Sequence, residues 1–245
     1  DQRWVEHSVS ALVGQRVFGL ALGYEDLNDH DQLRVDPLLA VLCEKADPTG
    51  MDRQRQEDKG KPLAGKRTWN RLEHGRESPS RYQKLLLREA AVADLFVTQF
   101  INRQKEAPQA LVLDLDATDD PLHGQQEGRF FHGYYDEYCY LPLYVFCGDD
   151  LLCAKLRPSN IDGSEGALEE VQRIVGRLRA AWPEVQITIR GDSGFAREEL
   201  MSWCEANNVD FILGLARNSR LETMLRPAMD SARRWHELMG QPVRV

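Results

Sequence analysis

The chain has 245 residues, of which 42% are hydrophobic and 29% charged, and this composition is typical of a folded globular protein rather than a disordered one. No stretch approaches the roughly 20 apolar residues that a membrane-spanning helix needs, and the N-terminus lacks the pattern of a secretion signal. We therefore expect a cytoplasmic protein. The five cysteines form no C-x-x-C pair, which argues against structural zinc and disulfides and predicts small buried thiols.

The net charge of −8 argues at first against a nucleic-acid partner, because phosphate binding uses Lys and Arg. The charge is unevenly distributed, however. Residues 1–110 carry 17 basic and 17 acidic side chains, whereas residues 111–245 carry 14 and 22. Residues 53–88 hold 11 basic side chains against 4 acidic ones. A basic segment beside an acidic domain fits a metal-using enzyme that holds DNA elsewhere on its surface, and a solvated linker explains it equally well.

Helical spacing dominates the first part of the chain. Asp36 followed by Pro37 marks a helix start, since an acid is a good N-cap and proline suits the first helical position. Between residues 4 and 42, apolar side chains recur every three or four positions, which predicts a small helical unit. The apolar positions of its first helix are Val5, Val9, Leu12, Val13, Val17 and Leu20.

A basic loop and a long helix follow. Residues 47–67 are rich in Asp, Gly, Pro, Lys and Arg, which predicts a loop or linker. A helix should begin at Ser78-Pro79 and continue through Phe100. We interpret residues 1–107 as a helical N-terminal region with a basic linker that serves in DNA binding or dimerisation. The candidates for contact with DNA, for which exposed helix residues are an equally good description, are Lys66, Arg67, Trp69, Arg71 and Arg76.

After Pro108 the pattern changes to alternating strands and helices. The expected order is β-β-β-α-β-α-β-α. Three strands joined by short turns pair antiparallel, while each β-α-β passage forces a parallel, right-handed crossover. The sequence therefore predicts an α/β domain over residues 108–245. It should hold a mixed five-stranded sheet flanked by helices, in the element order of the ribonuclease H fold.

Two acids lie at the end of the first of these strands. Side chains alternate across a strand, so Asp114 and Asp116 face one side, and Leu113 and Leu115 the other. In a strand buried on both faces, such carboxylates cost several kcal/mol unless a cation or hydrogen-bond donors compensate. A divalent metal is the most direct compensation, and Mg²⁺ prefers carboxylate oxygens. We favour Asp116 as the metal ligand because it lies nearest the carboxyl end. Asp114 is then a second ligand or a structural acid.

A second acidic motif, Gly191-Asp192-Ser193-Gly194, follows an apolar strand at the end where open α/β sheets bind ligands. The flanking glycines should let the backbone turn tightly. If the first and fourth strands are neighbours, Asp116 and Asp192 converge on one site. Carboxylates that share two metal ions about 3.5–4 Å apart suit in-line displacement at phosphorus. Each motif alone is structural in about half of cases, but the pair is a stronger signal.

These motifs resemble those of bacterial insertion-sequence DDE transposases, specifically the insertion sequence 1380 family. The stretch Asp114-x-Asp116-x-Thr118-x-x-Pro121-x-His123-Gly124-x-Gln126, with Gln125 as a neighbouring candidate for the family glutamine, resembles the first acidic block. The resemblance extends over nearly the whole chain. Its other segments are residues 23–30 (GYEDLNDH), 131–135 (FHGYY), 141–144 (LPLY) and 192–196 (DSGFA).

The resemblance implies that Asp116 and Asp192 are the first two members of an acidic triad that binds two Mg²⁺ or Mn²⁺ ions. Such an enzyme cuts double-stranded DNA at terminal inverted repeats and joins the freed 3′-hydroxyl to target DNA. A homodimer on DNA and a nucleoid-associated location are also implied. The family's third acid, a Glu on a helix after an inserted segment, is expected beyond residue 245, because Glu222 and Glu237 come too early and suit solvated helix positions. The chain by itself should then be inactive.

Other interpretations stay open. His123 could contact phosphate or orient a metal ligand, although an ordinary loop hydrogen bond is the commoner role. The aromatic residues between positions 130 and 140 suit core and hairpin packing better than stacking on bases. A glycoside hydrolase with two catalytic carboxylates would need no metal. A non-catalytic DNA-binding or dimerisation remnant would explain the missing Glu.

Overall fold

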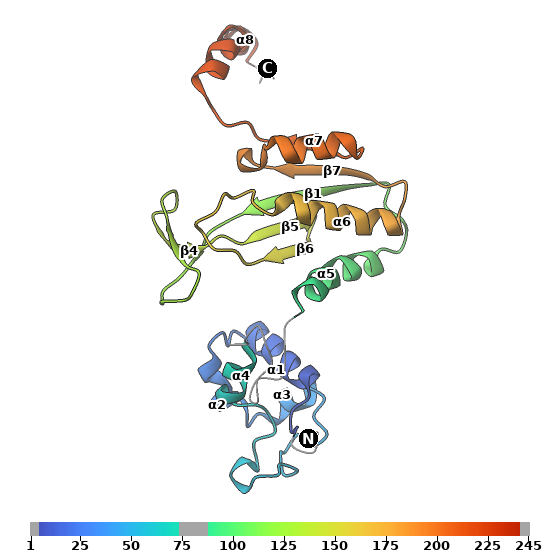
Figure 1. The fold of residues 1–245 in the computed structure, drawn as a ribbon, viewed down its shortest axis with the longest axis vertical. Coiled ribbons are helices and arrows are strands. Elements are labelled where there is room, and N and C mark those ends of the chain that lie inside the picture. The colour runs from blue at the N-terminus through green and yellow to red at the C-terminus, as the bar shows by residue number, and fades with distance from the viewer. Residues whose placement is uncertain (1–4, 74–87, 241–245) are drawn as a thin grey trace. The chain divides into compact units, whose positions relative to one another are not determined.

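A computed structural model describes residues 5–73 and 88–240 (Figure 1). The chain divides into two compact units, Asp1–Arg88 and Glu89–Val245. Among the described residues, the first unit has two small hydrophobic clusters and the second has one large cluster, and no cluster draws residues from both units.

The boundary between the units differs from the one predicted at residue 107. Helix α5 (Glu89–Arg103) buries Val97 and Phe100 in the core of the second unit. The helix therefore belongs with the sheet and not with the N-terminal helices, because its apolar side chains pack there. The expected helix start at Ser78-Pro79 lies outside the described residues.

The first unit is helical, as predicted. Asp36 caps α3 by accepting hydrogen bonds from the backbone N–H groups of Leu38 and Leu39, at 2.8 and 3.0 Å, which confirms the predicted helix start. The described elements are α1 (Val9–Ala21), η2 (Leu27–Asp29), α2 (His30–Leu33), α3 (Pro37–Leu42), η3 (Gln56–Asp58) and α4 (Lys66–Glu73).

The inward face of α1 was only partly predicted. Leu12 is buried, but the polar Gln15 is buried beside it. The Gln15 amide accepts a hydrogen bond from the backbone N–H of Ala64 at 3.0 Å and donates one to its carbonyl at 2.9 Å. These bonds turn the Gln15 side of the helix inward. The remaining predicted positions are therefore about half exposed, namely Val5, Val9, Val13, Val17 and Leu20.

A mixed five-stranded sheet, in the order β6-β5-β1-β7-β8, forms the centre of the second unit. β1 pairs antiparallel with β5 and parallel with β7, β5 pairs antiparallel with β6, and β7 pairs parallel with β8. This arrangement confirms the prediction and is that of the ribonuclease H fold. The strands are β1 (Ala110–Ala117), β5 (Leu143–Cys147), β6 (Asp150–Lys155), β7 (Gln186–Gly191) and β8 (Asp210–Leu213).

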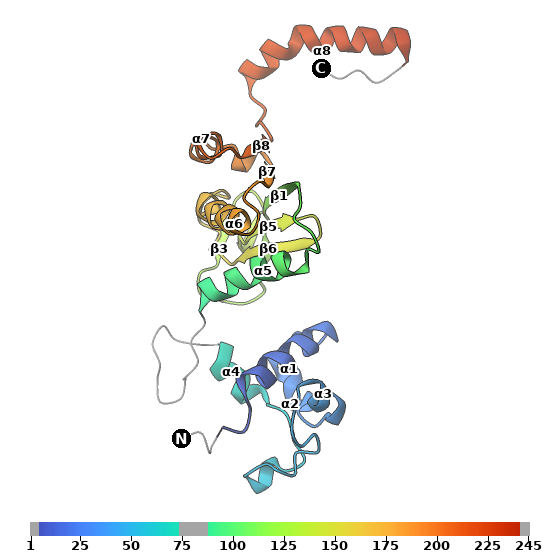
Figure 2. The same ribbon diagram turned by 90° about the vertical axis from the view of Figure 1, so that its right-hand side faces the viewer.

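Three helices pack against this sheet. α5, α6 (Ala167–Ala181) and α7 (Glu198–Ala206) share one hydrophobic cluster with the inward side chains of the strands, and Figure 2 shows α6 and α7 on one side of the strands. On the other face, Val112 is 41% and Ile212 64% exposed. Within the part of α8 (Ser219–Met239) that the structure describes, no residue is buried. The described helices therefore leave that face open.

A small three-stranded sheet, in the order β2-β4-β3, was not predicted. Its strands are β2 (Asp120–Pro121), β3 (Phe130–His132) and β4 (Glu137–Tyr140), which are too short to give a clear sequence pattern. Hairpin packing of the aromatic residues is confirmed, since Phe131 and Tyr138 form an edge-to-face pair across β3 and β4 with ring centroids 5.6 Å apart. Their predicted core packing is wrong, because Phe131, Tyr134 and Tyr138 are 53%, 85% and 49% exposed.

All five cysteines are free thiols. Cys43, Cys139, Cys153 and Cys204 are buried and Cys147 is half-buried, which confirms their predicted role as small buried side chains. Burial raises the pKa of Cys153 and Cys204 to about 11, so these thiols stay protonated near neutral pH. Among residues 5–73 and 88–240, no helix combines the length and the hydropathy that a membrane crossing requires.

Candidate active site and candidate DNA contacts

Strands β1 and β7 lie side by side (Figure 1), with Asp114 and Asp116 on β1 and Asp192 directly after β7. Their parallel register ends with Asp114 opposite Arg190, two residues before Asp116 and Asp192. Asp192 still has an extended backbone, with φ −76° and ψ −173°. Neighbouring strands lie about 4.8 Å apart, and paired side chains point to the same face. Both acids therefore lie at the carboxyl ends of neighbouring strands.

Asp114 has a different environment from Asp116. Arg190 donates two hydrogen bonds to the Asp114 carboxylate, one of them from Nη2 to Oδ2 at 2.8 Å. This contact raises the pKa of Arg190. Asp116 accepts no hydrogen bond from the residues that the structure describes. Asp114 is therefore neutralised by a partner on β7, whereas the described residues supply no such partner to Asp116.

The face that carries the two aspartates is not buried. Along β1, buried Leu111, Leu113 and Leu115 alternate with residues that reach solvent. The premise of a strand buried on both faces is therefore wrong, and desolvation does not call for a cation there. A cation site there rests instead on the donor type, because carboxylate oxygens at the ends of neighbouring strands are the ligands that a divalent cation prefers.

Asp192 is held in a short turn. Its Oδ1 accepts a hydrogen bond from the backbone N–H of Gly194 at 2.8 Å and so caps η4 (Ser193–Phe195). Neither flanking glycine has a positive φ. At Gly191 a Cβ would lie 3.1 Å from the Phe195 ring, so close packing rather than backbone freedom is the reason for glycine there.

Sequence reasoning missed Gly214, which follows β8. Its backbone N–H donates to the Gly191 carbonyl at 3.0 Å, and a Cβ on Gly214 would lie 2.8 Å from the backbone nitrogen of Ser193. The residue therefore supports the turn that carries Asp192. A lone glycine after a strand is too common a signal to have shown this role.

A further pair of acids, also missed, lies near the end of β1. A hydrogen bond with Asp119 raises the pKa of Glu137, whereas the nearby charge of His123 lowers it. Burial and the charges of Asp119 and Asp116 raise the pKa of Tyr135, whose hydroxyl donates to the Ala117 carbonyl at 3.4 Å. The small sheet thus brings His123 close to acids next to Asp116. Among the side chains of the two described stretches, no group of three metal-binding residues gathers.

The predicted DNA contacts of α4 divide into two kinds. Lys66 pairs with Asp31 at 3.7 Å, whereas Arg67 and Arg71 are exposed and have no partner among residues 5–73. Trp69 is 1% exposed and stacks on His30 with ring centroids 4.8 Å apart, so its predicted contact with DNA is wrong. Arg76 lies outside the described residues.

Comparison with known families places the chain. Residues 1–243 match the model of the family described as Transposase DDE domain group 1. The chain belongs to this family. Membership of a DDE transposase family agrees with the resemblance that the acidic motifs carry, and among curated proteins no relative matches this sequence.

Three solved transposase structures are similar to this DDE domain. The piggyBac transposase synaptic complex with hairpin DNA has 14% identity and a TM-score of 0.36, over 56% of this chain and 29% of that one. The catalytic domain of Mos1 mariner transposase has 10% identity and a TM-score of 0.33, over 66% of this chain and 77% of that one. The Drosophila P element transposase strand transfer complex has 12% identity and a TM-score of 0.32, over 86% of this chain and 46% of that one. These scores are too low to add to the argument from the DDE family match.

Proposed function

We propose that this DDE domain acts in a transposase that cleaves double-stranded DNA at the ends of a mobile element and joins the freed 3′-hydroxyl to target DNA. The observation that carries the proposal is the parallel pairing of β1 and β7, at whose carboxyl ends Asp116 and Asp192 lie. The family match across residues 1–243 supports the same reaction class. The finer assignment, to the insertion sequence 1380 family of bacteria and a cytoplasmic location, rests on the resemblance of the motifs alone.

Asp116 and Asp192 would hold the metal, Mg²⁺ or Mn²⁺, since their carboxylate oxygens are the donors that these ions prefer. When bound, a pair of such ions would activate the attacking oxygen and stabilise the leaving oxygen. The Gly194 N–H orients the Asp192 carboxylate through Oδ1. Arg190 forms an ion pair with the Asp114 carboxylate, so Asp114 would not bind the metal. A third metal ligand has to come from a residue other than the acids at the ends of the described strands.

Substitution of single aspartates tests this assignment. In the full-length protein, Asp116→Asn and Asp192→Asn should each abolish cleavage of element ends while DNA affinity is retained. Asp114→Asn is the matched control, since it removes a carboxylate two residues away that Arg190 already neutralises, and cleavage should persist. Cleavage at the normal rate by either of the first two variants would remove that residue from the mechanism.

A non-catalytic DNA-binding or dimerising remnant is the second candidate function. It is favoured because the described residues hold no cluster of three metal ligands. Mn²⁺ titration of the wild-type chain, followed by paramagnetic broadening of NMR signals, distinguishes the two. Broadening centred on Asp116 and Asp192 supports the enzyme, whereas diffuse broadening over the acidic surface supports the remnant. A homodimer, with one copy at each DNA end, is expected in either case.

A further inference from the structure

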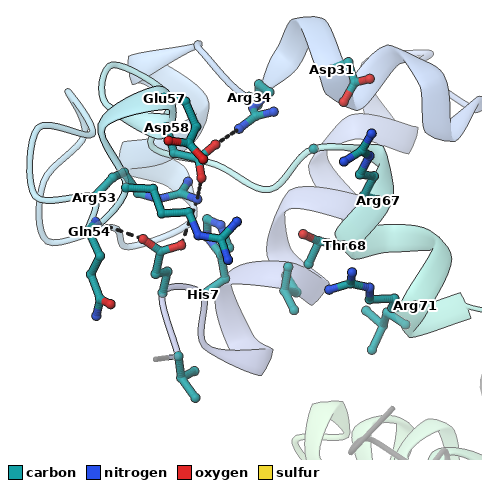
Figure 3. Close-up of a pocket in the computed structure, with 16 residues that line it drawn as sticks. His7, Asp31, Arg34, Arg53, Gln54, Glu57, Asp58, Arg67, Thr68 and Arg71 are labelled. Carbon is teal, nitrogen blue, oxygen red and sulfur yellow. Dashed lines mark hydrogen bonds and ion pairs between the residues drawn. The ribbon is translucent and has the colours of Figure 1, made fainter. Parts of the chain in front are cut away.

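A cavity of about 820 Å³ opens in the first unit (Figure 3). Its walls come from the residues before α1, from α1 and α2, from residues 53–58 and from α4. Segments that are far apart in the sequence therefore contribute cations to one opening. The arginines that line it are Arg34, Arg53, Arg55, Arg67 and Arg71.

The two inner arginines are already neutralised. Arg53 is 7% exposed and pairs with Glu6 at 3.0 Å and with Asp58 at 3.6 Å. Arg34 pairs with the same Asp58 at 2.8 Å. This network ties the residues before α1 to α2 and η3, as the dashed lines in Figure 3 show. It fixes the position of residues 53–58 and contributes little net charge.

The three arginines at the opening are not neutralised. Arg55, Arg67 and Arg71 are exposed, and none has a hydrogen bond or ion pair within residues 5–73. Of the acids that line the cavity, Glu57 alone lacks a cationic partner in this described stretch. The opening therefore keeps a net positive charge, which favours an anionic ligand.

The lining also indicates which anion fits. Arg67 and Arg71 stand one turn apart on α4, with Thr68 between them, on the side that faces residues 53–58 (Figure 3). The fork of a guanidinium matches phosphate oxygens. Among the described lining residues there is no Phe, Tyr or Trp, and the half-buried imidazole of His7 is the one ring on which a base could stack. These features favour phosphate groups over bases.

We propose that this cavity binds the sugar-phosphate backbone of duplex DNA, with Arg55, Arg67 and Arg71 contacting phosphate oxygens. The Arg34–Asp58–Arg53–Glu6 network positions residues 53–58 opposite α4. The inference rests on the proposed function, in which DNA is the substrate, and adds where the first unit holds it. Because phosphate contacts carry no sequence information, the cavity positions the DNA and does not read the terminal repeat.

The test measures binding of the chain to labelled duplexes of different sequence, by fluorescence anisotropy over a range of salt concentrations. Arg55→Ala, Arg67→Ala and Arg71→Ala should each weaken binding roughly three- to tenfold for every duplex and lower the salt slope by about 1. Arg71→Lys should retain most of the slope because the charge is kept. Lys59→Ala is the matched control, since Lys59 is exposed but lies outside the cavity, and both quantities should stay unchanged.

Two outcomes separate this inference from the proposed function. If the wild-type chain binds DNA and the three alanine variants behave like Lys59→Ala, the cavity is not the DNA site and this inference fails alone. If the wild-type chain binds no duplex, the proposed function fails with it. Thermal unfolding checks the fold of each variant, and the Tm should not change because the three arginines are exposed and have no partner among residues 5–73.

Two more outcomes concern the ligand. Weakening confined to one duplex sequence would show contact with bases and contradict the proposal. Inorganic pyrophosphate is the probe for a small-anion site. If Arg67→Ala abolishes pyrophosphate binding and leaves DNA affinity intact, the cavity takes a small anion and the proposal is overturned.

Discussion

At the scale of single residues, neighbours decide the roles of similar side chains. Asp114 and Asp116 occupy equivalent positions on one face of β1, and the sequence could not choose firmly between them. The choice depends on Arg190, which lies 76 positions from Asp114 and pairs with it across the sheet. Trp69 is a second example. A tryptophan in a basic segment suggests a contact with DNA, but the ring of Trp69 stacks on His30. Such contacts depend on tertiary pairing and leave no local signal.

Gly214 gives a prediction about the Asp192 turn. Gly214→Ala would place a methyl group 2.8 Å from the Ser193 backbone nitrogen, so the turn has to shift. We expect a loss of about 1–3 kcal/mol in unfolding free energy, and changed amide shifts at Ser193 and Gly194. Gly176→Ala is the control, because a Cβ there meets nothing within 4 Å and alanine favours a helix. Unchanged Ser193 shifts in Gly214→Ala would contradict the supporting role.

His7 gives a prediction about pH. Burial, with the charges of Arg53 and Lys45, lowers its pKa from 6.5 to about 4. As pH falls from 6.5 to 4, the unfolded chain takes up a proton that the folded chain does not. The first unit should lose up to about 3 kcal/mol of stability across this window, and the contribution is complete above pH 6.5. Urea unfolding at several pH values measures it.

The control for this pH effect is His7→Gln, which cannot titrate in this range. Its stability should depend less on pH between 4 and 6.5. Glu6, whose pKa is lowered by its bonds to Arg53 and Gln54 although burial opposes this, adds a separate loss of stability below its ordinary pKa of 4.5. An equal pH slope in the wild type and His7→Gln would show that the imidazole does not contribute.

At the scale of elements, the long strands and helices of the second unit could be predicted because their apolar periodicity agrees with their packing. β1 and β7 bury alternate residues, and α6 buries Val171, Ile174, Val175 and Leu178 on one side. The two- to four-residue strands of the small sheet are too short for such periodicity. In α1, a hydrogen-bonded glutamine faces inward, and Leu12 is the one predicted apolar position that is buried. Hydrophobicity alone could not show this.

The orientation of α1 can be tested with two neighbouring residues. Leu12 is 5% exposed, whereas Val13 is 51% exposed. Leu12→Ala should lower the unfolding free energy of the first unit by about 2–4 kcal/mol, because it leaves a cavity. Val13→Ala should change it by less than about 0.5 kcal/mol. Chemical denaturation measures both, and equal losses would show that the helix is rotated from the orientation described.

At the scale of the whole molecule, the two units keep separate cores, so each should unfold as its own cooperative block. Leu113 lies in the core of the second unit, at 0% exposed, and Leu12 in the core of the first. Leu113→Ala should therefore shift only the transition of the sheet, and Leu12→Ala only that of the N-terminal helices. Native-state hydrogen exchange, read at amides of β1 and of α1, resolves the two responses. If Leu113→Ala accelerates exchange equally in α1, the units unfold together, and DNA held by the first would then be coupled to the stability of the Asp116–Asp192 site.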